Sequence, residues 1–348
     1  MQESHFFANE MLPSSIIAPY DSGMVKTRSL GPYKVSQIGL GCMPMSGFPP
    51  DKAWILDKRD EAIGVIQASL DHGITLFDTS DIYAPTWNTI GHNERLVGEA
   101  VRTWSGPAEI KKTVVIATKG GITRAPSNNW FGVSGRNADE HYFYRAAEAS
   151  ALRLGVEKIQ LWQHHRLHHT IPFETQFENV LKLKEYGIVE NVGLSNINAE
   201  QLRRAVNIGG LPKDGGIISV QNEWSPRYRH GKEVLELCGE YGIAYLPWSP
   251  LGGIGKQGNM SSGSYPAFHE IANKKGVSPF ALTIAWHLAN SPVEIPIPGA
   301  TRKESILDSL KGTEVTISAE ELAYLNSSLP TELGPVDEEM TIHPPFRD

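Results

Sequence analysis

The chain is poor in cysteine: Cys42 and Cys238 are the only two among its 348 residues. Two cysteines so far apart in sequence supply neither a disulfide framework nor the ligand spacing of a zinc site. We therefore expect a protein of the reducing cytoplasm, in which both side chains act as small apolar groups.

Long apolar runs and a surplus of positive charge are also lacking. No stretch approaches the roughly 20 apolar residues that a membrane-spanning helix needs, which argues against a membrane protein. The first 23 residues carry an early acid and no continuous apolar core, unlike a signal peptide. The net charge of −7 argues against nucleic acid as a partner. We therefore expect the partner to be a small-molecule substrate. The sequence does not distinguish a monomer from a homo-oligomer.

What the chain does contain is a regular alternation of short apolar runs and helical patterns. Near-continuous apolar strands that alternate with helices are typical of a parallel sheet covered on both faces. Eight such units predict an α/β fold of the (β/α)8 TIM-barrel type. An open Rossmann sheet is the alternative, but no G-x-G-x-x-G follows the first strand. The expected strands are 37–41, 74–77, 113–118, 158–163, 190–194, 217–221, 243–247 and 294–297.

The expected barrel occupies residues 25–329 as one domain and begins with a β-hairpin whose turn lies at 30–32. Residues 1–24 form an N-terminal extension. Residues 330–348, rich in proline and acids, form a C-terminal tail. The expected helices are 60–71, 93–103, 139–154, 173–186, 199–208, 232–241, 266–275, 279–290, 303–311 and 318–329.

Polar side chains stand where the apolar runs end. An ionisable residue such as Asp78, directly after the run 74–77, is costly to bury unless a partner pairs with it. In a barrel these C-terminal strand ends meet at the mouth that carries the active site. The residues at strand ends are Asp78, Lys119, His165, Asn196, Gln221 and Trp248.

Three successive strand ends bring together Asp78, Tyr83, Lys119 and His165. A free tyrosine has a pKa of roughly 10, and an adjacent Lys119 ammonium is expected to lower it. Asp78 would hold the lysine, and His165 would orient a substrate carbonyl. A general acid beside a polarised carbonyl suits carbonyl reduction, with the hydride coming from a cofactor.

The residues also carry a family resemblance. In order along the chain, the motifs are GLGCM (39–43), FDTSDIY (77–83), GHNERLVGEA (91–100), ATKGG (117–121), LWQHHR (161–166), GIVENVGLSN (187–196), VQNEWSP (220–226), PWSPLGG (247–253) and IPIPGATR (295–302). With these motifs the chain resembles the aldo-keto reductases over about residues 25–329. The resemblance implies an NADPH-dependent reductase without metal or flavin.

The resemblance also implies roles for individual residues. Asp78, Tyr83, Lys119 and His165 would be the catalytic tetrad, with Tyr83 as the proton donor. Trp248 would stack on the nicotinamide ring, in a position where the family usually has tyrosine. The implied cofactor-binding residues are Gly41, Cys42, Met43, Asp78, Ser195, Asn196, Gln221, Trp248, Ser249, Pro250, Leu251, Gly253, Pro298, Gly299, Ala300, Thr301, Arg302, Ser305, Asp308 and Ser309.

The chain departs from the family pattern in two further places. Two adjacent histidines, His164 and His165, compete for the catalytic position, and the following Arg166 favours His165. At the adenine end, Ser305 and the pair Asp308-Ser309 offer fewer groups to grip a 2′-phosphate. NADPH is therefore the expected cofactor, with NADH possible.

The substrate is not identified by the sequence. Trp87, Trp130, Phe131 and Trp224 follow strand ends and are expected to line the pocket. The nearby Arg227 and Arg229 would suit a sugar-like or carboxylated carbonyl compound.

Other interpretations exist for several of these residues. The histidines between 164 and 169 match no zinc-ligand spacing, so no metal is expected. Lys119 could instead form a Schiff base, as in barrel aldolases. The same barrel could also bind a nicotinamide nucleotide as a regulatory sensor with little turnover.

Overall fold

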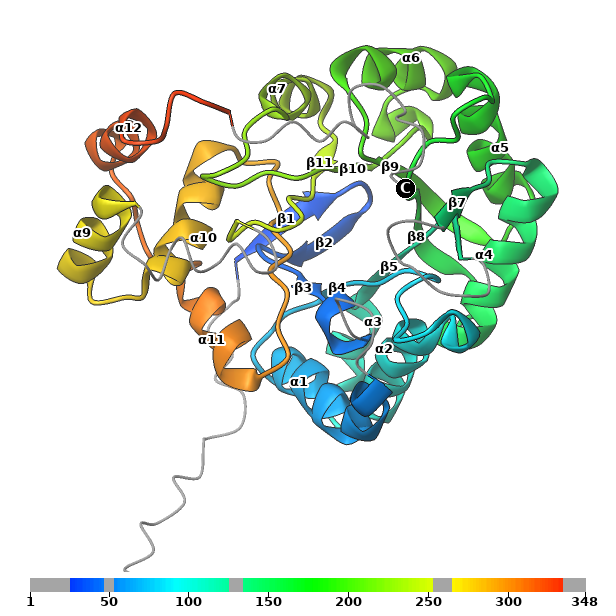
Figure 1. Cartoon of the computed structure of the whole chain (residues 1–348), viewed down its shortest axis with the longest axis horizontal. Coiled ribbons are helices and arrows are strands. Elements are labelled where there is room, and N and C mark those ends of the chain that lie inside the picture. The colour runs from blue at the N-terminus through cyan, green and yellow to red at the C-terminus, as the bar shows by residue number, and fades with distance from the viewer. Residues whose placement is uncertain (1–25, 47–52, 125–133, 253–264, 334–348) are drawn as a thin grey trace, which may run out of the picture.

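A curled parallel sheet forms the centre of the molecule (Figure 1). The computed structural model describes residues 26–46, 53–124, 134–252 and 265–333. Seven strands lie in the order β11-β10-β9-β8-β5-β4-β3. Each strand is thus hydrogen-bonded to the sheet strand that precedes or follows it along the chain, as in a (β/α)8 barrel. Their bounds are β3 Leu40–Gly41, β4 Leu76–Asp78, β5 Val115–Gly120, β8 Ile159–His164, β9 Val189–Ser195, β10 Ser219–Gln221 and β11 Ala244–Tyr245.

The eighth position of the ring is filled by residues 293–299, which bridge both edge strands of the sheet. Ile295 N–H donates to Tyr245 O at 2.8 Å, and Gly41 N–H donates to Pro298 O at 3.0 Å. The regular strand expected at 294–297 does not form. Pro296 and Pro298 have no N–H, so the edge that faces β3 can only accept hydrogen bonds. The ring is nevertheless joined on both sides, as the predicted barrel requires.

Two apolar layers hold the strands in place. Alternate side chains of the strands point inward and pack on one another, including Leu76, Ala117 and Leu161. The other side chains, such as Phe77 and Trp162, pack outward against the helices. This two-sided burial explains why the strands are apolar along their whole length.

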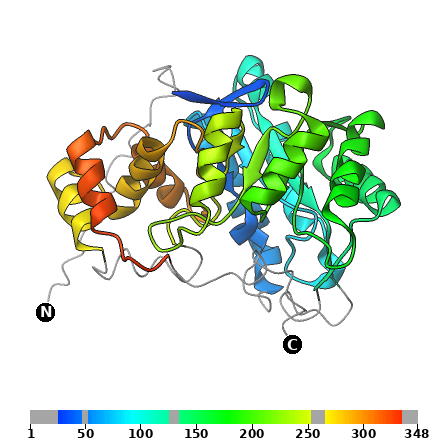
Figure 2. The same ribbon diagram turned by 90° about the horizontal axis from the view of Figure 1, so that it is seen from above.

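Helices surround the sheet as an outer ring (Figures 1 and 2). Most match the predicted ranges to within one or two residues. Their bounds are α1 Arg59–Asp71, α2 His92–Thr103, α3 Ala108–Thr113, α4 Glu140–Leu154, α5 Phe173–Glu185, α6 Ala199–Gly209, α7 Lys232–Tyr241, α9 Pro266–Lys275, α10 Pro279–Asn290, α11 Lys303–Lys311 and α12 Ala319–Ser327.

A β-hairpin closes the end of the barrel where the strands begin, as Figure 2 shows. It pairs β1 (Thr27–Leu30) with β2 (Tyr33–Ser36) in antiparallel fashion. The Tyr33 hydroxyl donates to Glu190 near the start of β9. Leu30 and Val35 enter the inner apolar cluster. The hairpin thus leaves the opposite end, where the strands finish, as the mouth.

Several short elements of the structure were not predicted from the sequence. No strand was expected between residues 118 and 139, but this stretch contains β6 (Ile122–Arg124) and β7 (Ser134–Arg136), which pair in antiparallel fashion. α3 and the 3-10 helices η1 (Met43–Ser46), η2 (Ala53–Lys58), η3 (Trp87–Thr89) and η4 (Pro212–Asp214) were also not predicted. Such elements are too short to give a periodic pattern. No described helix is long and apolar enough to cross a membrane.

The packing of α2 on α4 generates a prediction about Gly98. A Cβ added there would lie 2.3 Å from the backbone oxygen of Leu154, which has little freedom to move. Gly98→Ala should therefore lower the free energy of unfolding by about 1–3 kcal/mol. The matched control is Gly239→Ala on α7, where an added Cβ meets nothing within 4 Å. That variant should be neutral or stabilising by about 0.5–1 kcal/mol. Urea unfolding of both variants tests the packing, and equal stabilities would contradict it.

Candidate active site

The site is built around a buried lysine at the end of β5. The Lys119 side chain has no exposed surface. Its Nζ donates to Asp78 Oδ2 at 2.7 Å, to Thr79 O at 2.7 Å and to the Tyr83 hydroxyl at 3.2 Å. Three acceptors match the three protons of an ammonium group. The strand ends of β4 and β5 therefore bring Asp78, Tyr83 and Lys119 into one cluster.

A third strand end completes the environment of the carboxylate. Gln221, at the end of β10, donates from Nε2 to Asp78 Oδ1 at 2.7 Å. Both oxygens of Asp78 thus have a donor. Burial raises the pKa of Asp78, and Lys119 and Gln221 oppose this shift in part. For Lys119, burial lowers the pKa, but Asp78 and Tyr83 outweigh it and the net shift is upward. We therefore treat the lysine as an ammonium ion paired with a carboxylate.

Lys119 lowers the pKa of Tyr83 as expected, but the net shift at this site is upward. Burial raises the pKa of Tyr83 above its usual value, and Asp78 adds to that effect. Lys119 opposes the shift without reversing it. The lysine contacts the tyrosine twice, through the hydroxyl and through its position 4.9 Å from the ring centroid. Tyr83 is consequently a neutral phenol that still carries its proton.

His165 stands beside Tyr83 at the end of β8. The two rings meet edge to face with centroids 5.7 Å apart. Burial, together with the positive charges of Lys119 and Arg166, holds the pKa of His165 well below 6.5. The imidazole is therefore neutral near pH 7. Its Nδ1 lies 3.2 Å from Ser80 Oγ, which leaves Nε2 as the nitrogen available to a substrate.

The neighbouring His164 points the other way. Its ring packs edge to face on Phe143 of α4 at 4.9 Å, outside the sheet. Neither of its nitrogens has a hydrogen-bond partner among the described residues. Burial lowers the pKa of His164 to about 3. Strand alternation thus separates the two histidines, so they cannot share a metal ion. No group of three or more potential metal ligands occurs in the described parts of the chain.

Four of the predicted cofactor-binding residues, Ser195, Asn196, Gln221 and Trp248, form a connected network beside the tetrad. Ser195 Oγ donates to Gln221 O at 2.8 Å, and Asn196 Nδ2 donates to His165 O at 3.0 Å. The indole N–H of the half-buried Trp248 donates to Asn196 Oδ1 at 3.0 Å. An indole fixed in this way at the mouth is suited to stacking on a flat ring.

Backbone conformation also distinguishes this region. Among the described non-glycine residues, only Asn196 (φ 58°) and Ser249 (φ 52°) have positive φ. Conformations of this kind persist where surrounding structure enforces them, and they cluster at functional sites. Both residues were predicted from the sequence to contact the cofactor, so this backbone geometry fits the proposed site.

The glycine at the end of β3 allows a close approach of two backbones. A Cβ on Gly41 would lie 2.8 Å from Ile297 O. Gly41 forms a parallel β-bridge with Gly299, and Gly299 is exposed. Cys42 and Ala300 are buried and Met43 is half-buried beside them. These positions leave mainly backbone and small side chains to meet a ligand here.

The loop after β11 is described only in part. Pro250 is buried, and its carbonyl lies 3.0 Å from His287 Nε2. Leu251 is half-buried and packs against the outer cluster. Gly253 lies outside the described residues.

Of the residues predicted to bind the adenine end of the cofactor, some are exposed and others are hydrogen-bonded within the protein. Thr301 and Arg302 are exposed directly before α11, and Ser305 is half-buried in its first turn. Asp308 instead accepts a hydrogen bond from Ser278, the N-cap of α10. Ser309 is buried and donates to Ser305 O at 3.2 Å. The last two residues thus have structural partners within the helical layer.

Comparison with known proteins is consistent with this geometry. Residues 38–330 match the Aldo/keto reductase family. A protein named probable aldo-keto reductase 1 from Glycine max is 30% identical over 323 residues, which is 86% of each chain. The chain belongs to the aldo/keto reductase family. As a member of that family, the protein is an oxidoreductase.

Further relatives of this aldo/keto reductase agree. An uncharacterized oxidoreductase from Schizosaccharomyces pombe is 29% identical over 309 residues, covering 88% of this chain and 90% of the relative. A thermostable aldo-keto reductase in complex with the inhibitor epalrestat matches with a TM-score of 0.71 at 23% identity, over 87% of this chain and 99% of the other. An aldo-keto reductase from Klebsiella pneumoniae in complex with NADPH matches with a TM-score of 0.69 at 24% identity, over 90% and 98%. These structural likenesses confirm the barrel fold.

Of the predicted substrate-lining residues of the reductase, the structure describes Trp87 and Trp224. Trp87 is 40% exposed on η3. Trp224 is buried and stacks on Trp286 of α10, with centroids 6.2 Å apart, so it belongs to the outer core. Trp130 and Phe131 lie outside the described residues.

The suggestion that Arg229 meets a polar substrate is not supported. Its guanidinium donates to the carbonyls of Pro330 and Glu332, and its backbone N–H donates to Leu333 O. Arg229 therefore fastens the chain that follows α12. Arg227 is half-buried, and its positive charge partly opposes the rise in the pKa of Tyr265 that burial causes.

Two polar residues of α2 that hold the strand ends next to the tetrad were not predicted from the sequence. Asn93 joins the β4 end to the loop after β3, because Nδ2 donates to Cys42 O at 2.8 Å and Oδ1 accepts from Thr79 at 2.7 Å. The fully buried Glu94 accepts from Thr118 and pairs with Arg153. A signal was present, since polar side chains at 93 and 94 fall on the buried face of an amphipathic helix.

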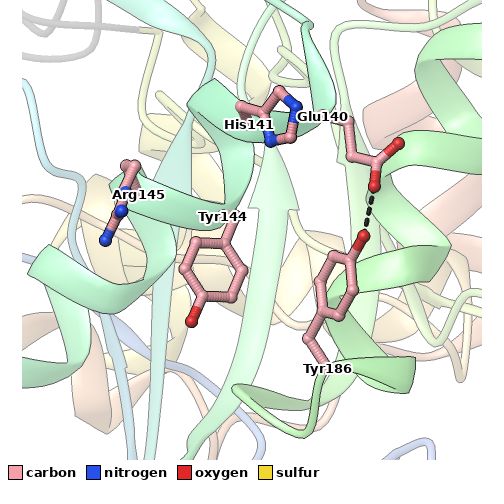
Figure 3. Close-up of a pocket in the computed structure, with 5 residues that line it drawn as sticks. All are labelled: Glu140, His141, Tyr144, Arg145 and Tyr186. Carbon is pink, nitrogen blue, oxygen red and sulfur yellow. Dashed lines mark hydrogen bonds between the residues drawn. The ribbon is translucent and has the colours of Figure 1, made fainter.

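A surface pocket of about 240 Å³ lies in the outer layer, between α4 and the residue that ends α5 (Figure 3). It is lined by Glu140, His141, Tyr144, Arg145 and Tyr186. The Tyr186 hydroxyl donates to Glu140 across it. No residue of the tetrad lines this pocket.

The buried Lys119–Asp78 pair generates a stability prediction. Lys119→Met leaves a buried carboxylate without its cation, and should cost about 3 kcal/mol of unfolding free energy at pH 7. The double variant Asp78→Asn, Lys119→Met should recover most of that loss. In the single variant the pKa of Asp78 is raised further above its unfolded value. The cost is therefore present at neutral pH and should shrink as the pH falls toward 5 and the carboxyl protonates. Denaturant unfolding at both pH values tests this, and a double variant no better than the single would contradict it.

Proposed function

We propose that this aldo/keto reductase uses NADPH to reduce an aldehyde or ketone to an alcohol, with Tyr83 as the proton donor. The observation that carries the proposal is the contact of one buried ammonium, Lys119, with both Asp78 and the Tyr83 hydroxyl. This arrangement suits a phenol that must give up a proton and become negative for a moment.

The residues of the chain take separate parts in this reaction. A substrate carbonyl at the mouth accepts hydrogen bonds from the Tyr83 hydroxyl and from Nε2–H of the neutral His165. The cofactor, when bound, supplies the hydride. Tyr83 donates its proton to the developing alkoxide, and the Lys119 ammonium stabilises the phenolate that remains. Asp78 keeps that ammonium in place and charged.

The cofactor is proposed to lie along the strand ends from β9 to the loop before α11. Trp248 would support the nicotinamide ring, and Ser195, Asn196 and Gln221 would bind its carboxamide. Arg302 would pair with a 2′-phosphate, because a guanidinium binds phosphate oxygens in bidentate fashion. Two family structures from Klebsiella pneumoniae contain NADP and NADPH, which supports the choice of cofactor. NADH stays a possible second cofactor, since Asp308 and Ser309 are engaged elsewhere.

Two other functions make different predictions. A Schiff-base lyase needs a neutral lysine, whereas the surroundings of Lys119 favour its ammonium form. A nucleotide-binding sensor would bind NADPH tightly and turn over no aldehyde of a broad panel. The free, buried Cys42 and Cys238 suit the proposed cytoplasmic location.

Removal of the proposed proton donor tests the mechanism. Tyr83→Phe should bind NADPH as tightly as the parent and lose at least about 100-fold in kcat, since only the proton transfer is removed. Tyr245→Phe is the matched control, because that tyrosine is also buried and its hydroxyl has no partner among the described residues. The control should keep its turnover. Near-parental kcat in Tyr83→Phe would rule out the proposed acid.

The proposed phosphate contact gives a test of cofactor choice. Arg302→Leu should weaken NADPH binding by about 10-fold, which corresponds to one lost charged contact of about 1.4 kcal/mol. NADH binding should be unchanged because NADH has no 2′-phosphate. Quenching of Trp248 emission in a fluorescence titration measures both. Arg145→Leu, at an exposed arginine on α4, is the control. Equal weakening of both nucleotides would remove Arg302 from the phosphate site.

A further inference from the structure

Two buried residues, Ser80 and Asp81, lie directly behind His165 and have no part in the tetrad. Ser80 is fully buried and Asp81 is 6% exposed. Ser80 Oγ lies 3.2 Å from His165 Nδ1 and 3.1 Å from Asp81 Oδ1. The three side chains therefore form a continuous chain from a carboxyl group to the imidazole.

The direction of the hydrogen bonds in this chain is not fixed by position alone. Ser80 has one hydroxyl proton and three acceptors within reach, namely Asp81 Oδ1, His165 Nδ1 and Lys119 O at 3.3 Å. An ionised Asp81 can only accept, so it takes the Ser80 proton. Nδ1 must then donate to Ser80 Oγ. A protonated Asp81 can donate to Ser80 Oγ instead, which frees the Ser80 proton for Nδ1.

The surroundings of Asp81 make both of its states accessible near neutral pH. Burial, reinforced by the negative charge of Glu94 on α2, raises the pKa of Asp81 to about 7. Arg153 on α4, the Ser80 hydroxyl and the Ile82 N–H act in the opposite direction. Tyr142 of α4 also faces Asp81, and burial raises its pKa, so it stays neutral.

We propose that Ser80 and Asp81 act as positioning residues that set the tautomer of His165. With Asp81 protonated, Nε2 carries a proton and donates to a substrate carbonyl, as reduction requires. With Asp81 ionised, Nδ1 carries the proton and Nε2 can only accept, so His165 no longer donates a hydrogen bond to the carbonyl. The use of the two tautomers rests on the proposed reductase function. The tautomer change itself does not.

The proton balance of this change is simple. Asp81 passes its proton to Ser80 Oγ, the Ser80 proton passes to Nδ1, and the Nε2 proton leaves at the mouth. One proton is released in total, and no other group changes charge. This route also explains how a carboxyl group with so little exposed surface can exchange its proton with solvent.

The tautomer can be read directly from the ring nitrogens by NMR of the full chain labelled with 15N-histidine, without cofactor or substrate. His165→Gln identifies the His165 signals. Between about pH 5.5 and 8.5 the proton should move from Nε2 to Nδ1, with a midpoint near the pH at which Asp81 ionises. Asp81→Asn should hold it on Nε2 throughout, because the amide N–H replaces the acid proton toward Ser80. Asp139→Asn, at the exposed N-cap of α4, is the control and should behave like the parent.

A second variant checks the cause. Glu94→Gln removes the charge that disfavours ionisation of Asp81, so the midpoint should move to lower pH by at least about half a unit. In turnover assays, kcat for carbonyl reduction should fall in the parent as the tautomer changes with rising pH, whereas Asp81→Asn should keep its kcat to pH 8. A His165 tautomer that ignores pH, or that switches equally in Asp81→Asn, would overturn the proposal. A tautomer switch without reductase turnover would support the relay and refute the proposed function.

Discussion

The constraint on which the site depends is the complete burial of the Lys119 ammonium. A charge without access to water is tolerated only if every proton has an acceptor and the charge has a counter-ion. Those partners come from Asp78, Thr79 and Tyr83, all on the chain that leaves β4. Gln221 then fixes the far oxygen of Asp78 from β10, three places around the barrel from β5. One buried cation thereby sets the relative positions of strands that are distant in sequence.

Much of this could be predicted from the sequence. Helices were recognised because an apolar face and a cap, such as Asp139 before α4 or Ser318 before α12, are local signals. The strand ends were recognised because an apolar run stops at a polar residue. What could not be predicted depends on distance in three dimensions. The upward pKa shift of Tyr83 follows from burial, and the structural role of Arg229 follows from where the chain after α12 returns.

The neutrality of the groups around the Lys119–Asp78 pair is the second theme of the site. His165 and Tyr83 both lose the tendency to ionise because water is excluded from them. Neutral groups can act as donors or acceptors according to where their protons lie, whereas charged groups act in one sense only. The mouth of the barrel therefore combines one fixed ion pair with neighbours whose hydrogen bonds can reverse.

The closure of the barrel at residues 293–299 has a mechanical consequence. On the side facing β3, Pro296 and Pro298 accept hydrogen bonds from Gly39 and Gly41 but return none, so that joint has about half the bonds of a normal parallel ladder. A joint with fewer hydrogen bonds resists deformation less than the rest of the ring. This joint lies beside Gly41 and Gly299, whereas Lys119 and Asp78 lie within the seven-stranded sheet. We therefore expect a change in the width of the barrel to occur at this joint rather than at the buried ion pair.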